Sequence, residues 1–225
     1  MKHDPEYVLT INDDEVFDAQ FLQRMVSTAR RVPRSVVGGL LLLWDEPHRV
    51  FQVSPRWETM SGGFRHWVRQ TVWTVPDSAW EVELIVGNCV LFPADAIREN
   101  GLMNEKSFPH YGDAEYTPRL RRNGWTLLVE PGARVFCQPN NLPPRVREMS
   151  VSKLFRTLFI DLGNTHSLRR RFLANWHGAP TRLRALIAFP VFFIRWAIGR
   201  NLEGDYATVV DEPPLSVTFR EKVVR

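Results

Sequence analysis

The sequence predicts an α/β fold in which a mixed sheet with flanking helices is followed by a basic helical segment. Up to about residue 140, short apolar runs typical of buried strands alternate with segments of helical periodicity. A proline-rich connector follows, and the pattern is then helical and strongly basic to about residue 200. We therefore divide the chain into an α/β portion at 1–140, a basic amphipathic helical segment at 141–200 and a tail at 201–225.

The first elements follow from apolar runs and their spacing. Tyr7–Ile11 is a short apolar run that ends at a carboxylate cluster, as expected of a buried parallel strand. Asp18–Arg31 has apolar residues at helical spacing. Val36–Trp44 is predicted to be a second buried strand, with Val50–Val53 beside it. Ser54–Ala79 has no clear period, and we expect a long irregular loop of the kind that is usually functional.

The second half of the α/β portion is predicted in the same way. Val82–Phe92 has strand character, and a helix opened by Pro93 should end at Gly101. His110–Asn123 is predicted to be a loop that runs into a helix, closed by Gly124. Two further strands are expected on either side of a Pro-Gly turn: Trp125–Val129 and Ala133–Phe136.

Composition limits the classes of protein to consider. At 225 residues, with 44% hydrophobic and 24% charged residues, the chain can bury a core and is not of the disordered class. Its two cysteines, Cys89 and Cys137, form neither a disulfide framework nor a zinc pattern. The first residues contain no apolar leader segment. We expect a reducing, cytoplasmic location.

The basic segment carries its charge beside a long apolar run. Between Arg145 and Arg200, eleven Lys or Arg residues are opposed by two acidic residues. The apolar run Ala185–Ile198 is interrupted and too short to span a bilayer. Two interpretations remain open: a helix lying on the inner face of the cell membrane, or a core helix with a solvated basic face. No nucleic-acid-binding module is recognisable, and we expect no nucleic-acid partner.

Two acidic clusters are the candidate sites for chemistry. Asn12, Asp13 and Asp14 directly follow the first predicted strand, where hard oxygen ligands suit Mg²⁺ or Mn²⁺. Asp113 and Glu115 lie at the predicted start of a helix, where the helix dipole stabilises a carboxylate and a general base can operate. Taken singly, each cluster is also explained by helix capping or a solvated turn.

Three segments carry a family resemblance by their order and spacing. Tyr7–Val16 resembles a strand followed by a DxD-type metal motif, Gly87–Phe92 resembles an acceptor-side strand, and Asp113–Tyr116 resembles an acidic motif that opens a helix. Together they resemble family 2-type glycosyltransferases of the GT-A fold, in particular the galactofuranosyl- and rhamnosyltransferase-like branch. The resemblance covers roughly residues 5–140.

The resemblance implies a partial GT-A fold at 1–140 and an inverting transfer of a sugar from a nucleotide-diphosphate donor to a glycan or lipid-linked acceptor. Asp14, with Asn12 in the other DxD position, would hold Mg²⁺ or Mn²⁺ against the donor diphosphate. Asp113 would be the base for the acceptor hydroxyl. We expect Asp14 at the end of a central strand and Asp113 across a cleft, on the order of 10 Å away. Donor or acceptor contacts are expected from Asp13, Gly87, Asn88, Glu115, Arg119 and Trp57.

The sequence also departs from the family pattern. Asn12 stands at the first acidic position of the DxD motif, Gly112 replaces the first acid of the pair at Asp113, and Cys137 lies near the place of a metal-binding histidine. The strands that hold the nucleoside have no counterpart before Tyr7. An incomplete sheet exposes an edge, so we expect either a fragment or split gene product, or a second chain that completes the sheet. The alternative function is a non-catalytic remnant or partner subunit that lacks donor binding.

Overall fold

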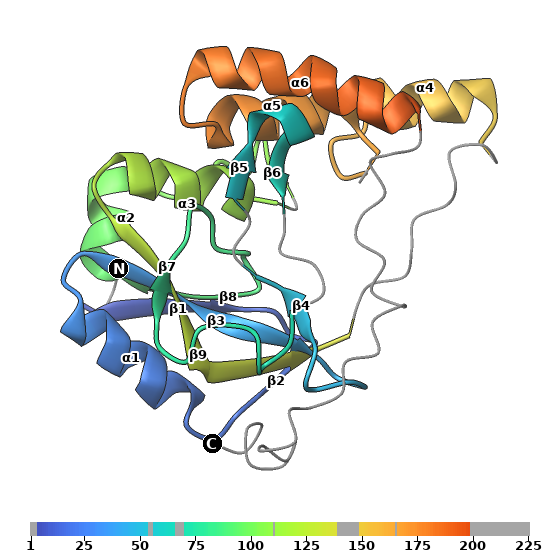
Figure 1. Ribbon diagram of the computed structural model, residues 1–225. Coiled ribbons are helices and arrows are strands. Elements are labelled where there is room, and N and C mark those ends of the chain that lie inside the picture. The colour runs from blue at the N-terminus through green and yellow to red at the C-terminus, as the bar shows by residue number, and fades with distance from the viewer. Residues whose placement is uncertain are drawn as a thin grey trace.

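The computed structural model describes residues 4–53, 56–65, 70–109, 111–138, 149–164 and 166–198. It contains a mixed seven-stranded sheet with the order β1-β8-β3-β9-β2, in which β4 also pairs with β3 and β7 with β9 (Figure 1). Helices flank this sheet, which confirms the predicted α/β class. The strands of the sheet are β1 (Tyr7–Ile11), β2 (Glu15–Phe17), β3 (Ser35–Leu43), β4 (Val50–Gln52), β7 (Trp80–Glu81), β8 (Cys89–Pro93) and β9 (Thr126–Cys137).

The centre of the sheet is the parallel pair β3 and β9. All nine residues of β3 are buried, because helices or packed loops cover both of its faces. Helix α1 (Phe21–Arg31) covers one face through Phe21, Met25 and Ala29. The other face packs against α2 (Ala94–Asn100) and α3 (Asp113–Arg122).

Strand β1 differs from the prediction in direction and position. It is an edge strand, paired antiparallel with β8, and its residues are half-buried or exposed. The prediction of a buried, parallel, central strand is therefore wrong. A short apolar run is common to both kinds of strand, and only the pairing partner decides between them.

Three other segments also differ from the prediction. The stretch 82–88 is not a strand, because Ile85 hydrogen-bonds the Thr117 side chain of α3 instead of a neighbouring strand. The Pro-Gly pair at 131–132 does not separate two strands: β9 continues past it beside β3, with only a register shift. The predicted irregular loop contains a hairpin of β5 (Arg56–Glu58) and β6 (Gly63–Arg65) around the 3₁₀ turn η1 (Thr59–Ser61).

The basic segment forms a helical layer beyond α3, at the top of Figure 1. Its helices are α4 (Val151–Phe159), α5 (Leu168–Gly178) and α6 (Arg182–Ala197). Each helix has a Ser or Thr cap whose side chain accepts a backbone N–H in the first turn. Helix α5 packs on α3, and α6 packs on η1 and β6.

The layer approaches the hairpin closely at Gly62, which has a φ of +91°. A Cβ atom there would lie 2.7 Å from Cα of Phe192. The predicted boundary near residue 140, His110 and the predicted tail at 201–225 lie outside the described residues. Among the helices that are described, none is long and apolar enough to cross a membrane.

Candidate functional site

The first acidic cluster lies in the loop between β1 and β2. Asn12, Asp13 and Asp14 are all exposed. The backbone N–H of Asn12 donates to the carbonyl of Asn88, 3.1 Å away, just before β8 begins. Glu15 follows as the first residue of β2, opposite Cys137 of β9. The loop is thus held at both ends. Asn12 is attached next to β8, the partner of β1, and Glu15 pairs with β9, the partner of β2.

Glu15 is a part of this cluster that the sequence analysis did not select. Both of its carboxylate oxygens are shielded from solvent and have no hydrogen-bond partner of acceptable geometry among the described residues. Burial raises the pKa of Glu15 to about 7, while the nearby Asn88 side chain and Asn12 backbone act in the opposite direction and the Asp14 charge adds to the rise. A shielded carboxylate without a partner, next to a second carboxylate, is a place that a cation would stabilise.

The second cluster begins at Asp113, the first residue of α3. The backbone N–H of Gly87 donates to Oδ2 of Asp113 at 3.1 Å. One turn further along α3, the Thr117 hydroxyl accepts the N–H of Ile85 at 3.2 Å. These two hydrogen bonds attach the 85–88 loop to the start of α3.

The 85–88 loop therefore connects the two clusters. Asn88 holds the loop that carries Asn12, and Gly87, its neighbour in the chain, holds Asp113. A Cβ atom on Gly87 would lie 2.8 Å from Cβ of Asp113, so only glycine allows this approach without a shift. Asn12 and Asp113, about a hundred positions apart in the sequence, therefore each contact one residue of the Gly87–Asn88 dipeptide.

The helical layer places a positively charged side chain, Arg170 of α5, near Asp113. Arg170 of α5 stacks on Tyr111, with the guanidinium carbon 3.1 Å from the ring centroid. Burial raises the pKa of Asp113, while the N–H groups around it and the Arg170 charge lower it. The sequence analysis missed Arg170 and Tyr111, because the basic segment carries many arginines and nothing in their spacing singles out this one.

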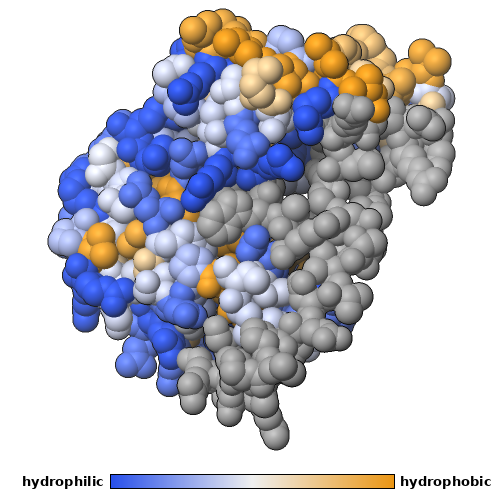
Figure 2. Space-filling model, viewed as in Figure 1, coloured by the Kyte–Doolittle hydropathy of each residue, from blue (hydrophilic) through white to orange (hydrophobic). Residues whose placement is uncertain are grey.

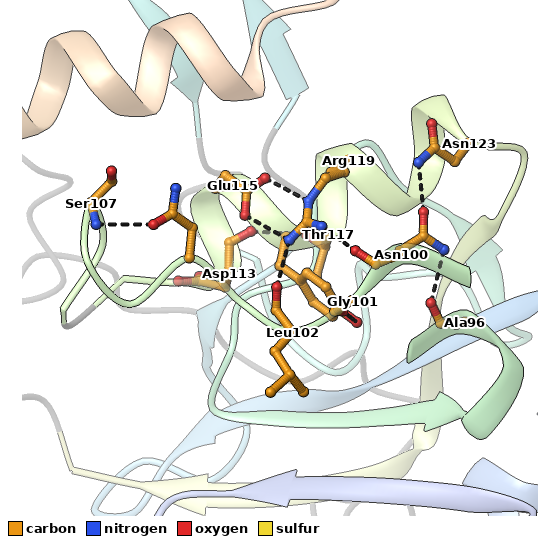
Figure 3. Close-up of polar contacts among 12 residues, drawn as sticks. Ala96, Asn100, Gly101, Leu102, Ser107, Asp113, Glu115, Thr117, Arg119 and Asn123 are labelled. Carbon is orange, nitrogen blue, oxygen red and sulfur yellow. Dashed lines mark hydrogen bonds and ion pairs between the residues drawn. The ribbon is translucent and has the colours of Figure 1, made fainter. Parts of the chain in front are cut away.

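Glu115 and Arg119, which are expected to contact the donor or acceptor, bind each other in the structure. Arg119 binds Glu115 through two nitrogens, Nε at 2.7 Å and Nη2 at 3.1 Å. It also donates to the carbonyls of Asn100 and, at 2.8 Å, Leu102 (Figure 3). The Glu115 side chain is 5% exposed. This group ties α3 to the end of α2, and all three guanidinium nitrogens of Arg119 are engaged in it.

Trp57 is not brought to either acidic cluster. It lies on β5, with its backbone N–H on Glu83 and its ring edge-on to Phe64. It lines a cavity of about 20 Å³ beside the last turns of α3, at the end opposite Asp113. Such a volume holds about one water molecule and no sugar ring. The structure therefore places Trp57 as a packing residue of the hairpin.

The two cysteines lie beside the first cluster. Cys137 ends β9 opposite Glu15, at the place expected from the family pattern, and Cys89 begins β8 opposite Ile11. Burial raises the pKa of Cys137 to about 12, and the Glu15 and Asp14 charges add to the rise. A thiolate is a soft ligand, and Mg²⁺ and Mn²⁺ prefer the oxygen ligands of carboxylates, carbonyls and water.

The donor set fits a hard divalent ion only in part. Within the described residues, no group of three or more His, Cys, Asp or Glu side chains is placed to hold a metal ion. Asp14 and Glu15 carry carboxylates, which are hard oxygen donors, and the charge of Asp14 acts on Glu15. Mg²⁺ is commonly held by one or two carboxylates together with substrate phosphates, and such an arrangement suits these two residues.

Comparisons with known proteins give limited information. No protein-family model matches the sequence, and no curated protein matches it. Among solved structures, the chain is similar to one described as GalNAc-T7 with UDP, GalNAc and Mn²⁺, with a TM-score of 0.49 and 9% sequence identity. The match covers 86% of this chain and 40% of that chain.

Proposed function

We propose that this protein is a glycosyltransferase of GT-A-like fold that uses a nucleotide-diphosphate sugar and a divalent metal ion. The observation that carries the proposal is the junction at Gly87 and Asn88, where a loop bearing Asp14 and Glu15 meets a partly buried carboxylate, Asp113. A metal half-site and a candidate base on either side of one dipeptide are the parts that in-line sugar transfer requires.

Each residue of the junction has a role in this proposal. Asp14 and Glu15 hold Mg²⁺ or Mn²⁺, which when bound stabilises the charge on the departing nucleoside diphosphate. Asp113 takes the proton of the acceptor hydroxyl, and its raised pKa makes it a stronger base than an exposed aspartate. The N–H of Gly87 orients that carboxylate. Arg170 offers a positive charge to an anionic part of the donor or acceptor.

The finer features are proposed on the family resemblance. Inversion at the anomeric carbon needs one base and one metal ion, and we assign these parts to Asp113 and to the Asp14–Glu15 pair. A glycan or lipid-linked acceptor and a cytoplasmic location at the inner face of the membrane are part of the same proposal. Within the described residues, β1 pairs with β8 alone, and its other edge is where a second chain would add the strands that hold the nucleoside.

Two features favour the alternative, a non-catalytic partner subunit. Asn12 contributes no charge to the metal half-site, and within the described residues no group of three or more His, Cys, Asp or Glu side chains is placed to hold a metal ion. In this alternative the junction has only a structural role in this chain, and donor binding requires a second chain.

The test is donor turnover by the full chain. Nucleotide-diphosphate sugars are incubated with the protein and Mn²⁺, and release of nucleoside diphosphate is measured with and without a chelator. We expect slow, metal-dependent release that Asp113→Asn lowers by about a hundredfold, the usual contribution of a general base. Asp95→Asn, on the exposed side of α2, is the matched control. Metal-independent release, or equal release by Asp113→Asn, would refute the transferase proposal. No release from the chain alone would support the partner subunit.

A further inference from the structure

The exposed apolar side chains of this protein are concentrated on the helical layer. Seventeen large hydrophobic residues are exposed in the described chain, and eleven of them lie between Val151 and Ile198. Figure 2 shows the same concentration as a band along the top of the molecule, over α4 and α6. Exposed apolar side chains scattered singly are normal, but a continuous group of this size marks an interaction surface.

On α6 the exposed large hydrophobic residues form one stripe. At about 100° of rotation per residue they fall on one face of the helix, with the exposed Pro190 between the two halves of the stripe. The exposed Arg182 and Arg184 lie beside its N-terminal end. The stripe consists of Leu183, Leu186, Ile187, Phe193, Ile194 and Ile198.

The opposite face of α6 accounts for its packing on the protein. Ala185 and Ala188 are buried, Phe189 meets Phe172 of α5 edge-on, and Phe192 lies against Gly62. Phe189 and Trp196 are half-buried, so Phe193 is the aromatic residue of α6 that belongs to the exposed stripe. Helix α6 is thus apolar on both faces, and the protein covers only the inner one. An exposed apolar face of this kind is stabilised by contact with another apolar surface.

Helix α4 extends the same surface. Val151, Phe155 and Phe159 follow one another at intervals of four and are all exposed, with the two phenylalanine rings 5.2 Å apart. Figure 1 shows α4 in the same layer as α6, and Figure 2 shows hydrophobic residues gathered over this part of the layer.

The charges around these stripes identify the partner. Between residues 149 and 198 the described chain holds eight Lys or Arg side chains and a single acidic one, Asp161. Lys153, Arg156, Arg182 and Arg184 are exposed on the helices that carry the stripes. Long basic side chains can reach phosphate groups while the apolar residues beside them enter the acyl region. A nucleic acid would match the charges but offers no apolar surface for the stripes.

We infer that the outer face of α4 and α6 docks on an anionic phospholipid bilayer. The apolar stripes enter the boundary between headgroups and acyl chains, and the basic side chains contact the anionic headgroups. The helices lie in the plane of the surface with their inner faces still packed on α3 and the β5–β6 hairpin. This inference does not depend on the proposed transferase activity.

Vesicle co-sedimentation of the full chain tests the inference. Vesicles of phosphatidylcholine alone are compared with vesicles in which phosphatidylglycerol replaces part of it. We expect binding to the anionic vesicles that weakens as salt is raised. The triple variant Leu186→Ser/Phe193→Ser/Ile194→Ser should bind at least tenfold more weakly, because three partly inserted side chains are lost. It replaces exposed residues, and circular dichroism verifies that it is folded.

Two controls make the result specific. Met60→Ser/Leu102→Ser removes two apolar residues that are more exposed than these three and lie in other parts of the molecule, and it should leave vesicle binding unchanged. Lys153→Gln/Arg156→Gln/Arg184→Gln should remove the preference for anionic vesicles.

Absence of binding by the unaltered chain, or binding that the triple serine variant does not weaken, would overturn the inference. So would light scattering that shows a dimer in the unaltered chain and a monomer in the triple serine variant, because the stripe would then be the contact between two copies.

Discussion

At the scale of single residues, Gly87 controls how the two acidic clusters meet. Its N–H orients Asp113, and its missing side chain lets the 85–88 loop lie directly against that carboxylate. We predict that Gly87→Ala displaces Asp113 and lowers donor turnover at least tenfold, since a shift of about 1 Å in a reacting group can cost a hundredfold.

Gly132→Ala is the matched control for this prediction. Its new Cβ would meet only the flexible end of the Arg24 side chain, away from the junction. Thermal denaturation of both variants separates a shifted carboxylate from a loss of folding. Unchanged turnover in folded Gly87→Ala would show that the position of Asp113 does not matter.

The residues of the candidate site were only partly predictable. The resemblance selects Asn12, Asp14, Asn88 and Asp113, and the structure brings the loops that carry them together. It could not select Glu15, whose importance lies in a shielded carboxylate without a partner. Burial and missing partners are properties of the packed protein, and no spacing of residues in the sequence expresses them.

At the scale of elements, the Glu115–Arg119 pair fixes α3 against the end of α2. We predict that Arg119→Met lowers the free energy of unfolding by about 3 kcal/mol, because it leaves Glu115 buried without its partner. Urea denaturation measures the change. Arg121→Met on the same helix is the control: its distant ion pairs with Glu81 and Glu83 are exposed, and less than about 1 kcal/mol should be lost. Equal losses of unfolding free energy in both variants would show that the Glu115–Arg119 pair does not hold α3 against α2.

The contact between α5 and the rest of the protein should depend on pH through His177, whose ring meets Phe108 edge-on. Burial lowers the pKa of His177, and the neighbouring Glu115 carboxylate opposes this only in part. The folded state thus binds the proton less tightly than the unfolded state. The resulting stability is present above the unfolded pKa, near 6.5, and is lost as the pH falls through that value toward the folded pKa.

We therefore predict that His177→Gln reduces the drop in stability between neutral pH and pH 5, as measured by urea denaturation at each pH. An identical drop in the variant and the unaltered protein would show that His177 is not responsible.

The elements themselves were predictable where one periodicity holds over their length. This applies to α1, β3 and the C-terminal helices. The errors have a common cause: β1, the 82–88 stretch and β9 depend on what lies beside them. The sequence of the run at 82–86 does not show which group its backbone N–H groups bind. At Ile85 the partner is the Thr117 side chain and not a neighbouring strand.

At the scale of the whole molecule, the proposed metal half-site and base lie at one edge junction of the sheet, and the helical layer has two faces. The inner face of that layer supplies Arg170 to the Asp113 end of the site. The outer face carries the apolar stripes. One element, α5, thus links the candidate site to the layer proposed to dock on lipid.

The central claim, that the junction binds a divalent ion together with a diphosphate, is tested most directly by Mn²⁺ electron paramagnetic resonance. The signal of free Mn²⁺ falls when the ion is bound. We predict a fall when the full chain and a nucleoside diphosphate are both present, and at least tenfold weaker binding in Asp14→Asn/Glu15→Gln, because the variant removes both carboxylates proposed to hold the ion. Asp18→Asn, which removes a charge just beyond the cluster, should bind as the unaltered chain does. A signal that the protein leaves unchanged, or that falls equally with the double variant, would contradict the account.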